Sequence, residues 1–213
     1  MIHQFQALAD EYGLVIRSDN CPPGAEACRY LYSREKRERN YKYRYAYAEC
    51  WGAEQSLATS IAWVLLNPAK GDTDKTQRRT LETCRKHSQT SRYARNKSYS
   101  GLVIVNVFPY RATDVKELRR LSRGEAEGAL DVNDRVLEVI TRDCARVVAA
   151  WGNDGALHGR SAIVRPKLKN PYCLQKNVGG RWQDTTKSGE PFHPARAADD
   201  AKLIRLLRRG PGG

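Results

Sequence analysis

The chain has 213 residues, which fits one globular domain better than a multidomain assembly. Its 37 Lys and Arg residues outnumber its 24 Asp and Glu residues, and a net charge of +13 favours a polyanionic partner, with nucleic acid as the first candidate. The sequence contains no apolar run long enough to span a membrane, and residues 1–10 lack the basic and apolar stretches of a secretion signal. We therefore expect a soluble, cytoplasmic, monomeric protein that makes no membrane contact.

The cysteines are spread along the chain and form no Cys-x-x-Cys pair. They are Cys21, Cys28, Cys50, Cys84, Cys144 and Cys173. This spacing argues against a zinc finger or a thioredoxin-type motif and predicts reduced, buried thiols. An iron–sulfur cluster with distant ligands stays open as an alternative.

The chain order suggests a short lead-in followed by one domain. Residues 1–40 combine a short predicted helix, Gln4–Tyr12, with turn and charge-rich segments, so we expect a peripheral N-terminal lead-in. Residues 41–204 form a single α/β domain in this interpretation, and residues 205–213 form a basic tail.

A period of two marks the start of that domain. Tyrosines stand at positions 41, 43, 45 and 47 with Lys42 and Arg44 between them, which predicts a strand with its aromatic side chains on one face. An ordinary half-buried strand is the first interpretation. Base stacking by an exposed tyrosine is the alternative.

Further along, short aliphatic runs alternate with stretches of helix length. The predicted strands are Ser60–Leu66, Gly101–Val107, Arg146–Trp151 and Tyr172–Leu174, and the predicted helices include Asp74–His87 and Asn133–Asp143, with Asp131 or Asn133 as a cap of the latter. This alternation predicts an α/β three-layer sandwich, with a central, mainly parallel four-stranded sheet flanked by helices. Ligands of such folds bind beyond the carboxyl ends of the strands.

Polar side chains follow three of these strands. Asn67 and Asn106 stand at the tips of the first two, where an amide suits the edge of a nucleobase because it both donates and accepts hydrogen bonds. The third strand ends at Trp151-Gly152-Asn153, which can open toward an anion. His193 lies between Phe192 and Pro194, which present it rigidly.

Several motifs together resemble a bacterial domain family of unassigned function. They are Leu65-Leu66-Asn67-Pro68, Asp74-x-Thr76-x-Arg78-Arg79, Val105-Asn106-x-Phe108-x-Tyr110-Arg111-Ala112-Thr113-Asp114, Asn133-Asp134, Val147-Val148-Ala149-Ala150-Trp151-Gly152 and Thr186-Lys187-x-Gly189-x-Pro191-x-His193-Pro194. More distantly, Asn67-Pro68, Asn106 and His193-Pro194-Ala195 resemble, in their order, the uracil-DNA glycosylase superfamily. There an Asn-Pro or Asp-Pro motif follows the first strand, an Asn after the second reads the base, and a late His-Pro loop supplies a histidine and enters the duplex.

This second resemblance implies a DNA glycosylase that hydrolyses the N-glycosidic bond of a flipped base without a metal or organic cofactor. Asn67 would orient the attacking water, His193 would donate to a base oxygen, and Asn106 would read the base. Phe108 and Tyr110 are the candidates to stack on the base, and Ala195–Arg196 is the candidate wedge. The candidate DNA-binding cations are Arg78, Arg79, Arg111, Lys187 and Arg196.

Other interpretations stay open. Asp72, Asp74 or Asp114 would supply a carboxylate that replaces or assists Asn67. The polar insertion at 175–185 suggests a bulky or decorated base, as in modified viral DNA, and therefore a defence enzyme. A catalytically silent nucleic-acid-binding module and a hydrolase of free nucleosides or nucleotides are the rival classes.

Overall fold

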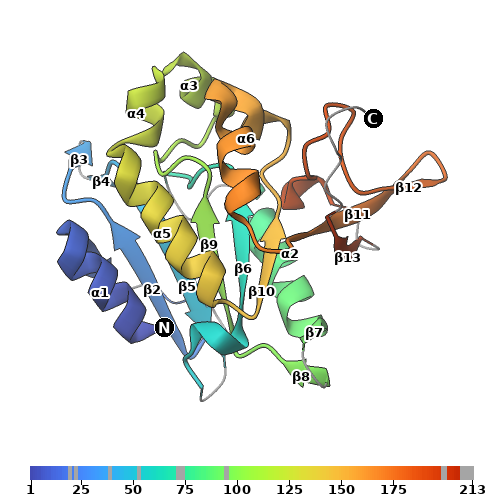
Figure 1. Ribbon diagram of the computed structural model, residues 1–213, viewed down its shortest axis with the longest axis horizontal. Helices are drawn as coiled ribbons and strands as arrows, with labels where there is room; N and C mark the ends of the chain where they lie inside the picture. The colour runs from blue at the N-terminus through green and yellow to red at the C-terminus, as the bar shows by residue number, and fades with distance from the viewer. Residues whose placement is uncertain are drawn as a thin grey trace.

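A mixed sheet of nine strands forms the middle of the computed structural model (Figure 1). The structure describes residues 1–18, 21, 24–37, 40–51, 54–70, 75–93, 96–197 and 201–206. The strand order is β1-β2-β5-β9-β6-β10-β11-β12, and β13 also pairs with β11. These strands are β1 (Val15–Arg17), β2 (Ala27–Tyr32), β5 (Arg44–Cys50), β6 (Ser60–Leu65), β9 (Gly101–Asn106), β10 (Arg146–Ala149), β11 (Tyr172–Val178), β12 (Arg181–Gln183) and β13 (Lys202–Arg205).

The four strands predicted from aliphatic runs are β6, β9, β10 and β11, and they lie next to one another in parallel in the order β9-β6-β10-β11. Every residue of β6 and β9 is buried, which explains their unbroken apolar sequences. The prediction of a four-stranded, mainly parallel sheet was nevertheless wrong. Five more strands pair antiparallel at its two sides, and most of them are short or carry polar residues, so their sequences do not resemble buried strands.

Helices cover both faces of the sheet. On one face α1 (Ile2–Tyr12) and α5 (Leu130–Asp143) contribute Phe5, Leu8 and Leu137 to a core that includes Val64. On the other face α2 (Lys75–Thr90) packs Cys84 against Trp63, whose Nε1 donates to Ser88 Oγ at 3.0 Å. Helical segments thus form the outer layers of a mixed α/β fold.

Residues 1–40, expected as a peripheral lead-in, are continuous with this core. Met1 is buried, β2 pairs with β5, and β1 extends the same sheet. At the other end, Arg205 lies in β13 and Leu206 is buried, while 207–213 lies outside the described residues.

A disulfide joins Cys21 to Cys28, whose Cα atoms are 5.3 Å apart, so the expectation of reduced thiols was wrong for this pair. The spacing of the two cysteines alone does not reveal this proximity. The other four cysteines are free, and three of them are buried. Among the described residues no group of three or more His, Cys, Asp or Glu side chains is placed to hold a metal ion.

The tyrosine-rich strand departs from its predicted alternation. Leu31 of β2 pairs with Ala46 and Tyr32 pairs with Arg44, so the register skips Tyr45. This β-bulge places Tyr45 in the core under α5 while Tyr47 faces the α2 side, and the expected single aromatic face is therefore absent. Arg44 lies on the α2 side, near the rings of Tyr30 and Tyr47.

Shorter elements complete the described fold. They are β3 (Lys36–Arg37), β4 (Asn40–Tyr41), η1 (Leu57–Thr59), β7 (Arg92–Tyr93), β8 (Lys97–Ser98), α3 (Val115–Arg120), α4 (Arg123–Glu127), η3 (Asn153–Gly159), α6 (Arg160–Val164), η4 (Arg165–Lys167) and η5 (Pro194–Arg196). The helices in the described ranges are all too short or too polar to cross a lipid bilayer.

Candidate functional site

A pocket of about 730 Å³ opens at the carboxyl ends of the parallel strands, on the α2 side of the sheet. After β6 the chain turns toward α2, and after β10 it turns toward η3 and α6, whose Val164 packs in the opposite core. These diverging connections make the β6–β10 boundary a topological switch point, where open α/β sheets bind their ligands. The loops after β6, β9 and β10 and the loop before η5 all line the pocket.

Asn67 enters the pocket from the loop after β6. Its Nδ2 donates to the carbonyl oxygens of Ala112 at 2.8 Å and of Pro68 at 3.1 Å. Two carbonyl acceptors fix the orientation of the amide, because an amide oxygen in that position would meet them without a proton. The Oδ1 of Asn67 is therefore the atom left to accept a hydrogen bond from a ligand or a water.

Asn106, the last residue of β9, is 2% exposed and lines the pocket. Within the described residues its side-chain amide has no hydrogen-bond partner. Its backbone carbonyl accepts from Asn133 Nδ2 at 3.1 Å, and the next carbonyl, of Val107, accepts from Asn133 and from Arg160 Nε. Asn133 therefore supports the strand tip from behind and does not cap α5, whose N-cap residue is Ala129.

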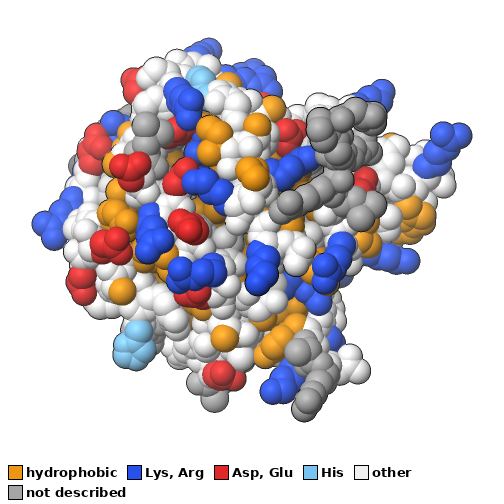
Figure 2. All heavy atoms as spheres, viewed as in Figure 1, with side chains coloured by type: hydrophobic (Ala, Val, Ile, Leu, Met, Phe, Trp, Pro, Cys, Tyr) orange, Lys and Arg blue, Asp and Glu red, His pale blue; other side chains and the backbone are white. Residues whose placement is uncertain are grey.

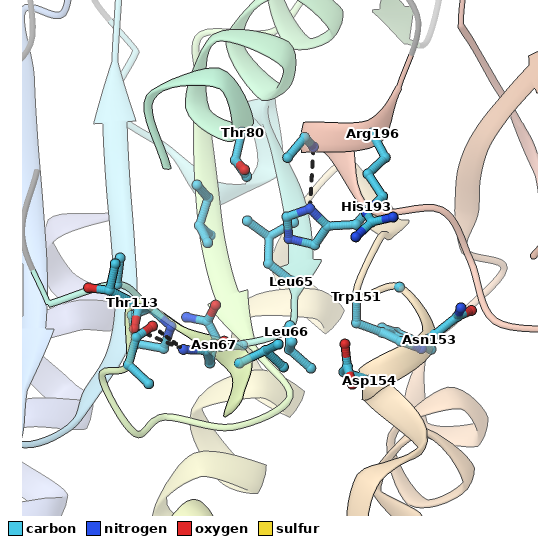
Figure 3. Close-up of a pocket in the computed structure, with 18 of the residues that line it drawn as sticks. Leu65, Leu66, Asn67, Thr80, Thr113, Trp151, Asn153, Asp154, His193 and Arg196 are labelled. Atoms are coloured by element: carbon cyan, nitrogen blue, oxygen red, sulfur yellow. Dashed lines mark hydrogen bonds between the residues drawn. The ribbon is translucent and has the colours of Figure 1, made fainter. Parts of the chain in front are cut away.

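His193 enters across the pocket from Asn67 (Figure 3). The backbone N–H of Ala195 donates to His193 Nδ1 at 3.3 Å. Burial and the neighbouring Arg196 lower the pKa of His193 to about 4, although the Asp154 carboxylate acts in the opposite sense. The ring is thus neutral at pH 7 with its proton on Nε2, which makes His193 a hydrogen-bond donor without positive charge.

The segment that carries His193 is anchored beneath the pocket. Glu190 is buried and accepts from Trp151 Nε1 at 2.6 Å and from Ser161 Oγ at 2.7 Å, while the backbone N–H of Gly152 donates to Pro191 O at 2.9 Å. The contacts that Trp151 and Gly152 make directly after β10 therefore fix the position from which His193 enters the pocket.

Charged side chains of both signs line the pocket. Arg119 donates to Asp154 at 2.5 and 2.9 Å, so these two charges neutralise each other at the rim. Lys176 and Arg196 stand on the β11 and η5 side. Arg44 of β5 is the fourth cationic residue that lines the pocket.

The structure does not bring every predicted residue to the pocket. Phe108 and Tyr110 are 0% and 3% exposed and pack in the α5-side core, because the chain after β9 turns them away from the pocket. Arg111 donates to the carbonyl oxygens of Tyr41, Ala69 and Lys70, so its guanidinium holds the loop after β6 in place.

The remaining predicted cations surround the opening. Arg78 and Arg79 are exposed on α2, just before the pocket-lining Thr80, and Lys187 is exposed next to Thr186 at the rim. Arg196 lines the pocket itself.

Of the carboxylates considered as alternatives to Asn67, Asp72 and Asp74 lie outside the described residues. Asp114 lines the pocket and caps α3, where its Oδ1 accepts from the backbone N–H of Lys116 at 2.9 Å.

Sequence reasoning missed Arg44 as a pocket residue. Arg44 lies on the face opposite Tyr43 and Tyr45, and the bulge at Tyr45 brings Tyr47 to the side of Arg44. Bulges of this kind re-aim side chains beside active sites. A cation at the start of a strand whose other residues are mostly apolar was the available signal.

Fold and pocket together define an α/β protein with a candidate ligand site at a switch point of its sheet, lined by apolar and polar side chains. Residues 44–195 match a family described as a protein of unknown function (DUF1643), and the chain belongs to that family. This confirms the nearer resemblance drawn from the motifs. Neither the curated proteins nor the solved structures contain a match to the chain.

Proposed function

We propose that this protein is a DNA glycosylase-like hydrolase that removes a flipped base from DNA. The observation that carries the proposal is the meeting of Asn67, Asn106 and His193 in one pocket, although they come from three loops far apart in the sequence. Their order along the chain resembles that of the uracil-DNA glycosylase superfamily, and we propose that the chain is a distant member of it.

The reaction joins a water oxygen to C1′ of the sugar while the C1′–N bond breaks and its electron pair leaves with the base. The water gives up one proton to solvent, and the released base anion takes one proton from solvent, so the products are a sugar hydroxyl and a neutral base. Such a reaction develops positive charge on the sugar and negative charge on the base. The free Oδ1 of Asn67 is suited to orient the water, because its Nδ2 is already held by Ala112 and Pro68. Asn67 is a weak base, so the rate enhancement has to come from positioning and from a stabilised leaving group.

His193 and Asn106 act on the base in this proposal. A neutral imidazole whose Nε2–H faces the pocket can donate to a base oxygen as negative charge builds there. The amide of Asn106 supplies a donor and an acceptor to the edge of the base, and its backbone is fixed by Asn133.

The surface around the opening suits a nucleic-acid backbone. Arg196 and Lys187 stand at the rim, and the chain carries a net charge of +13. Lys and Arg side chains also lie on the projecting hairpin at the right of Figure 2, which views the α5 side of the molecule. The η5 turn, with Ala195 and Arg196, is the proposed wedge that replaces the everted nucleotide in the stack.

The insertion at 175–185 forms most of the β11–β12 hairpin, which projects from the rest of the fold (Figure 1), and Lys176 of this hairpin lines the pocket. A pocket of about 730 Å³ is in the range of sites for drug-sized ligands, larger than an unsubstituted base needs. We therefore propose a bulky or decorated base as the substrate, with modified phage DNA as its source and defence as the role.

The test is mass spectrometry of bases released from chemically diverse DNAs, including modified phage genomes. We expect release by the wild type and a loss of about 10²–10³-fold in rate for Asn67→Ala and for His193→Ala. His3→Ala on α1 is the control, since His3 is exposed and lies outside the pocket. Release of plain uracil alone would overturn the modified-base proposal.

Two other outcomes would replace the enzyme proposal. DNA binding without release of any base would assign a silent nucleic-acid-binding module. Turnover of free nucleosides that is insensitive to salt would assign a small-substrate hydrolase.

A further inference from the structure

Arg44 is a buried cation that lines the candidate pocket. The residue is 6% exposed, it lines the pocket, and its Nε is buried without a hydrogen-bond partner. No described residue forms an ion pair or a side-chain hydrogen bond with it. An isolated charge in such a place is unfavourable unless something else compensates it.

The immediate neighbours of Arg44 are aromatic rings. The guanidinium carbon lies 5.9 Å from the ring centroid of Tyr30 and 6.0 Å from that of Tyr47. Cation–π contacts of this length stabilise the charge only in part. Aromatic rings accept no conventional hydrogen bond from Nε, which stays unsatisfied in the described structure.

The buried carboxylate on the same strand is already occupied. Glu49 accepts two hydrogen bonds of 2.6 Å from Arg85 and one of 2.5 Å from Tyr47. It also stands five positions from Arg44 along a strand, which is about 17 Å. Glu49 therefore does not neutralise Arg44.

Arg160 shows how this fold treats a buried arginine with a structural role. It is 2% exposed, yet it reaches Val107 O, Asp134 and Glu127. Arg44 has no comparable set of partners among the described residues, and it lines the pocket. The contrast indicates that the partner of Arg44 arrives with the ligand.

We propose that Arg44 is the anion-recognising residue of this pocket, and that the ligand presents to it a planar nitrogen heterocycle that carries negative charge. The inference rests on the proposed function for its DNA substrate, but the recognition itself does not require catalysis. The charge has two possible sources with the same chemistry: the anion of a base as it leaves the sugar, or an acidic group already present on the base. Arg44 and Asn106 line the same pocket. Arg44 can therefore bind the charged edge of a ring while the amide of Asn106 binds a neutral edge of the same ring.

Binding of a matched pair of small molecules tests the recognition directly. Orotate and orotamide share a uracil ring and differ in a carboxylate against a neutral amide, and calorimetry measures their affinities for wild type, Arg44→Lys and Arg44→Gln. We expect the wild type to bind orotate about tenfold or more tightly than orotamide, because hydrogen bonds to charged groups are the stronger ones. Arg44→Gln should abolish the preference, and Arg44→Lys should keep part of it, because lysine retains the charge without the planar fork.

Thermal unfolding separates this role from a structural one. Because no described residue forms an ion pair with Arg44, Arg44→Gln should not lower the Tm, whereas Arg160→Gln, which breaks its ion pairs with Asp134 and Glu127, should lower it clearly. Equal affinity of the wild type for orotate and orotamide, a preference that survives in Arg44→Gln, or a Tm of Arg44→Gln as low as that of Arg160→Gln would each overturn the inference.

Base release distinguishes the two sources of charge. If Arg44→Gln slows release of neutral bases, the leaving anion is the species that Arg44 binds. If it slows release only of bases with an acidic substituent, that substituent is the ligand group. An Arg44-dependent orotate preference in a protein that releases no base would support the anion site and contradict the glycosylase.

Discussion

A methyl group added to Gly152 would lie 3.1 Å from the Cβ of His193, so the end of β10 and the histidine loop are in direct contact. The Gly152 backbone has a φ of +73° and a ψ of −173°, a combination that only glycine adopts readily. The substitution Gly152→Ala should cost about 1–3 kcal/mol of unfolding free energy and displace His193. The rate of base release per folded molecule should also fall, which kinetic measurements corrected for the folded fraction of the sample would show.

Gly159→Ala is the control for backbone strain. Gly159 has a φ of +71°, and nothing lies within 4 Å of an added Cβ. We expect it to lose stability while its rate per folded molecule stays at the wild-type value. Equal rate losses in the two variants would mean that the contact with His193 is unimportant.

The lowered pKa of His193 predicts a pH-dependent stability. The folded-state pKa of about 4 is below the ordinary value of 6.5, so between these values the unfolded chain binds more protons than the folded protein. The stability from neutral His193 is fully present above about pH 6.5 and is lost as the pH falls toward 4, by up to about 1.4 kcal/mol per pH unit.

Urea unfolding of wild type and His193→Gln at about pH 7 and pH 5 measures this effect. The difference between the two proteins should shift in favour of the variant at the lower pH. His87 also has a pKa lowered by burial, but it is present in both proteins and cancels in the comparison. A difference that stays constant with pH would mean that His193 titrates normally in the folded protein.

The parts of the fold that were predictable have short-range signals. The strands β6 and β9 are buried on both faces, and their sequences are continuous aliphatic runs because nothing polar is tolerated there. The amides Asn67 and Asn106 were visible as polar residues directly after such runs, and the pocket does bring them together.

The parts that were missed depend on contacts between distant segments. Tyr47 lies on the side of Arg44 because one residue of β5 bulges, and no sequence pattern marks the bulge. Glu190 holds Trp151 across 39 positions of the chain, so its anchoring role appears only when both are packed together. Phe108 and Tyr110 follow directly after Asn106 at the end of β9, but the chain turns there and both side chains pack in the core.

The hydrogen bonds of Asn67 predict that Asn67→Asp destabilises the protein. Replacing it with Asp supplies a stronger base, yet both hydrogen bonds that its Nδ2 gives to Ala112 and Pro68 would be lost. A carboxylate oxygen would instead face two carbonyl oxygens, at a cost of about 1–3 kcal/mol for each unsatisfied buried group.

We expect Asn67→Asp to be less stable than Asn67→Ala and to recover stability as the pH is lowered and the new carboxyl gains a proton. Denaturant unfolding across pH measures both effects, and equal stability of the two variants at neutral pH would contradict the assigned amide orientation.

The cations around the opening should contribute to DNA affinity and not to the chemical step. Arg196 and Lys187 are exposed near η5 and the pocket rim, so they should contact phosphates if DNA enters there. Each Ala substitution should weaken binding to all DNA sequences alike and lower the slope of log affinity against log salt by about 1, because each phosphate contact releases about one counterion. Lys97→Ala is the matched control: Lys97 is exposed in β8, which precedes the amino end of β9 at the opposite edge of the sheet (Figure 1). Fluorescence anisotropy with a labelled duplex over a salt series gives the slopes, and a slope for Lys97→Ala that falls as far as those of the rim variants would show that DNA does not approach the pocket.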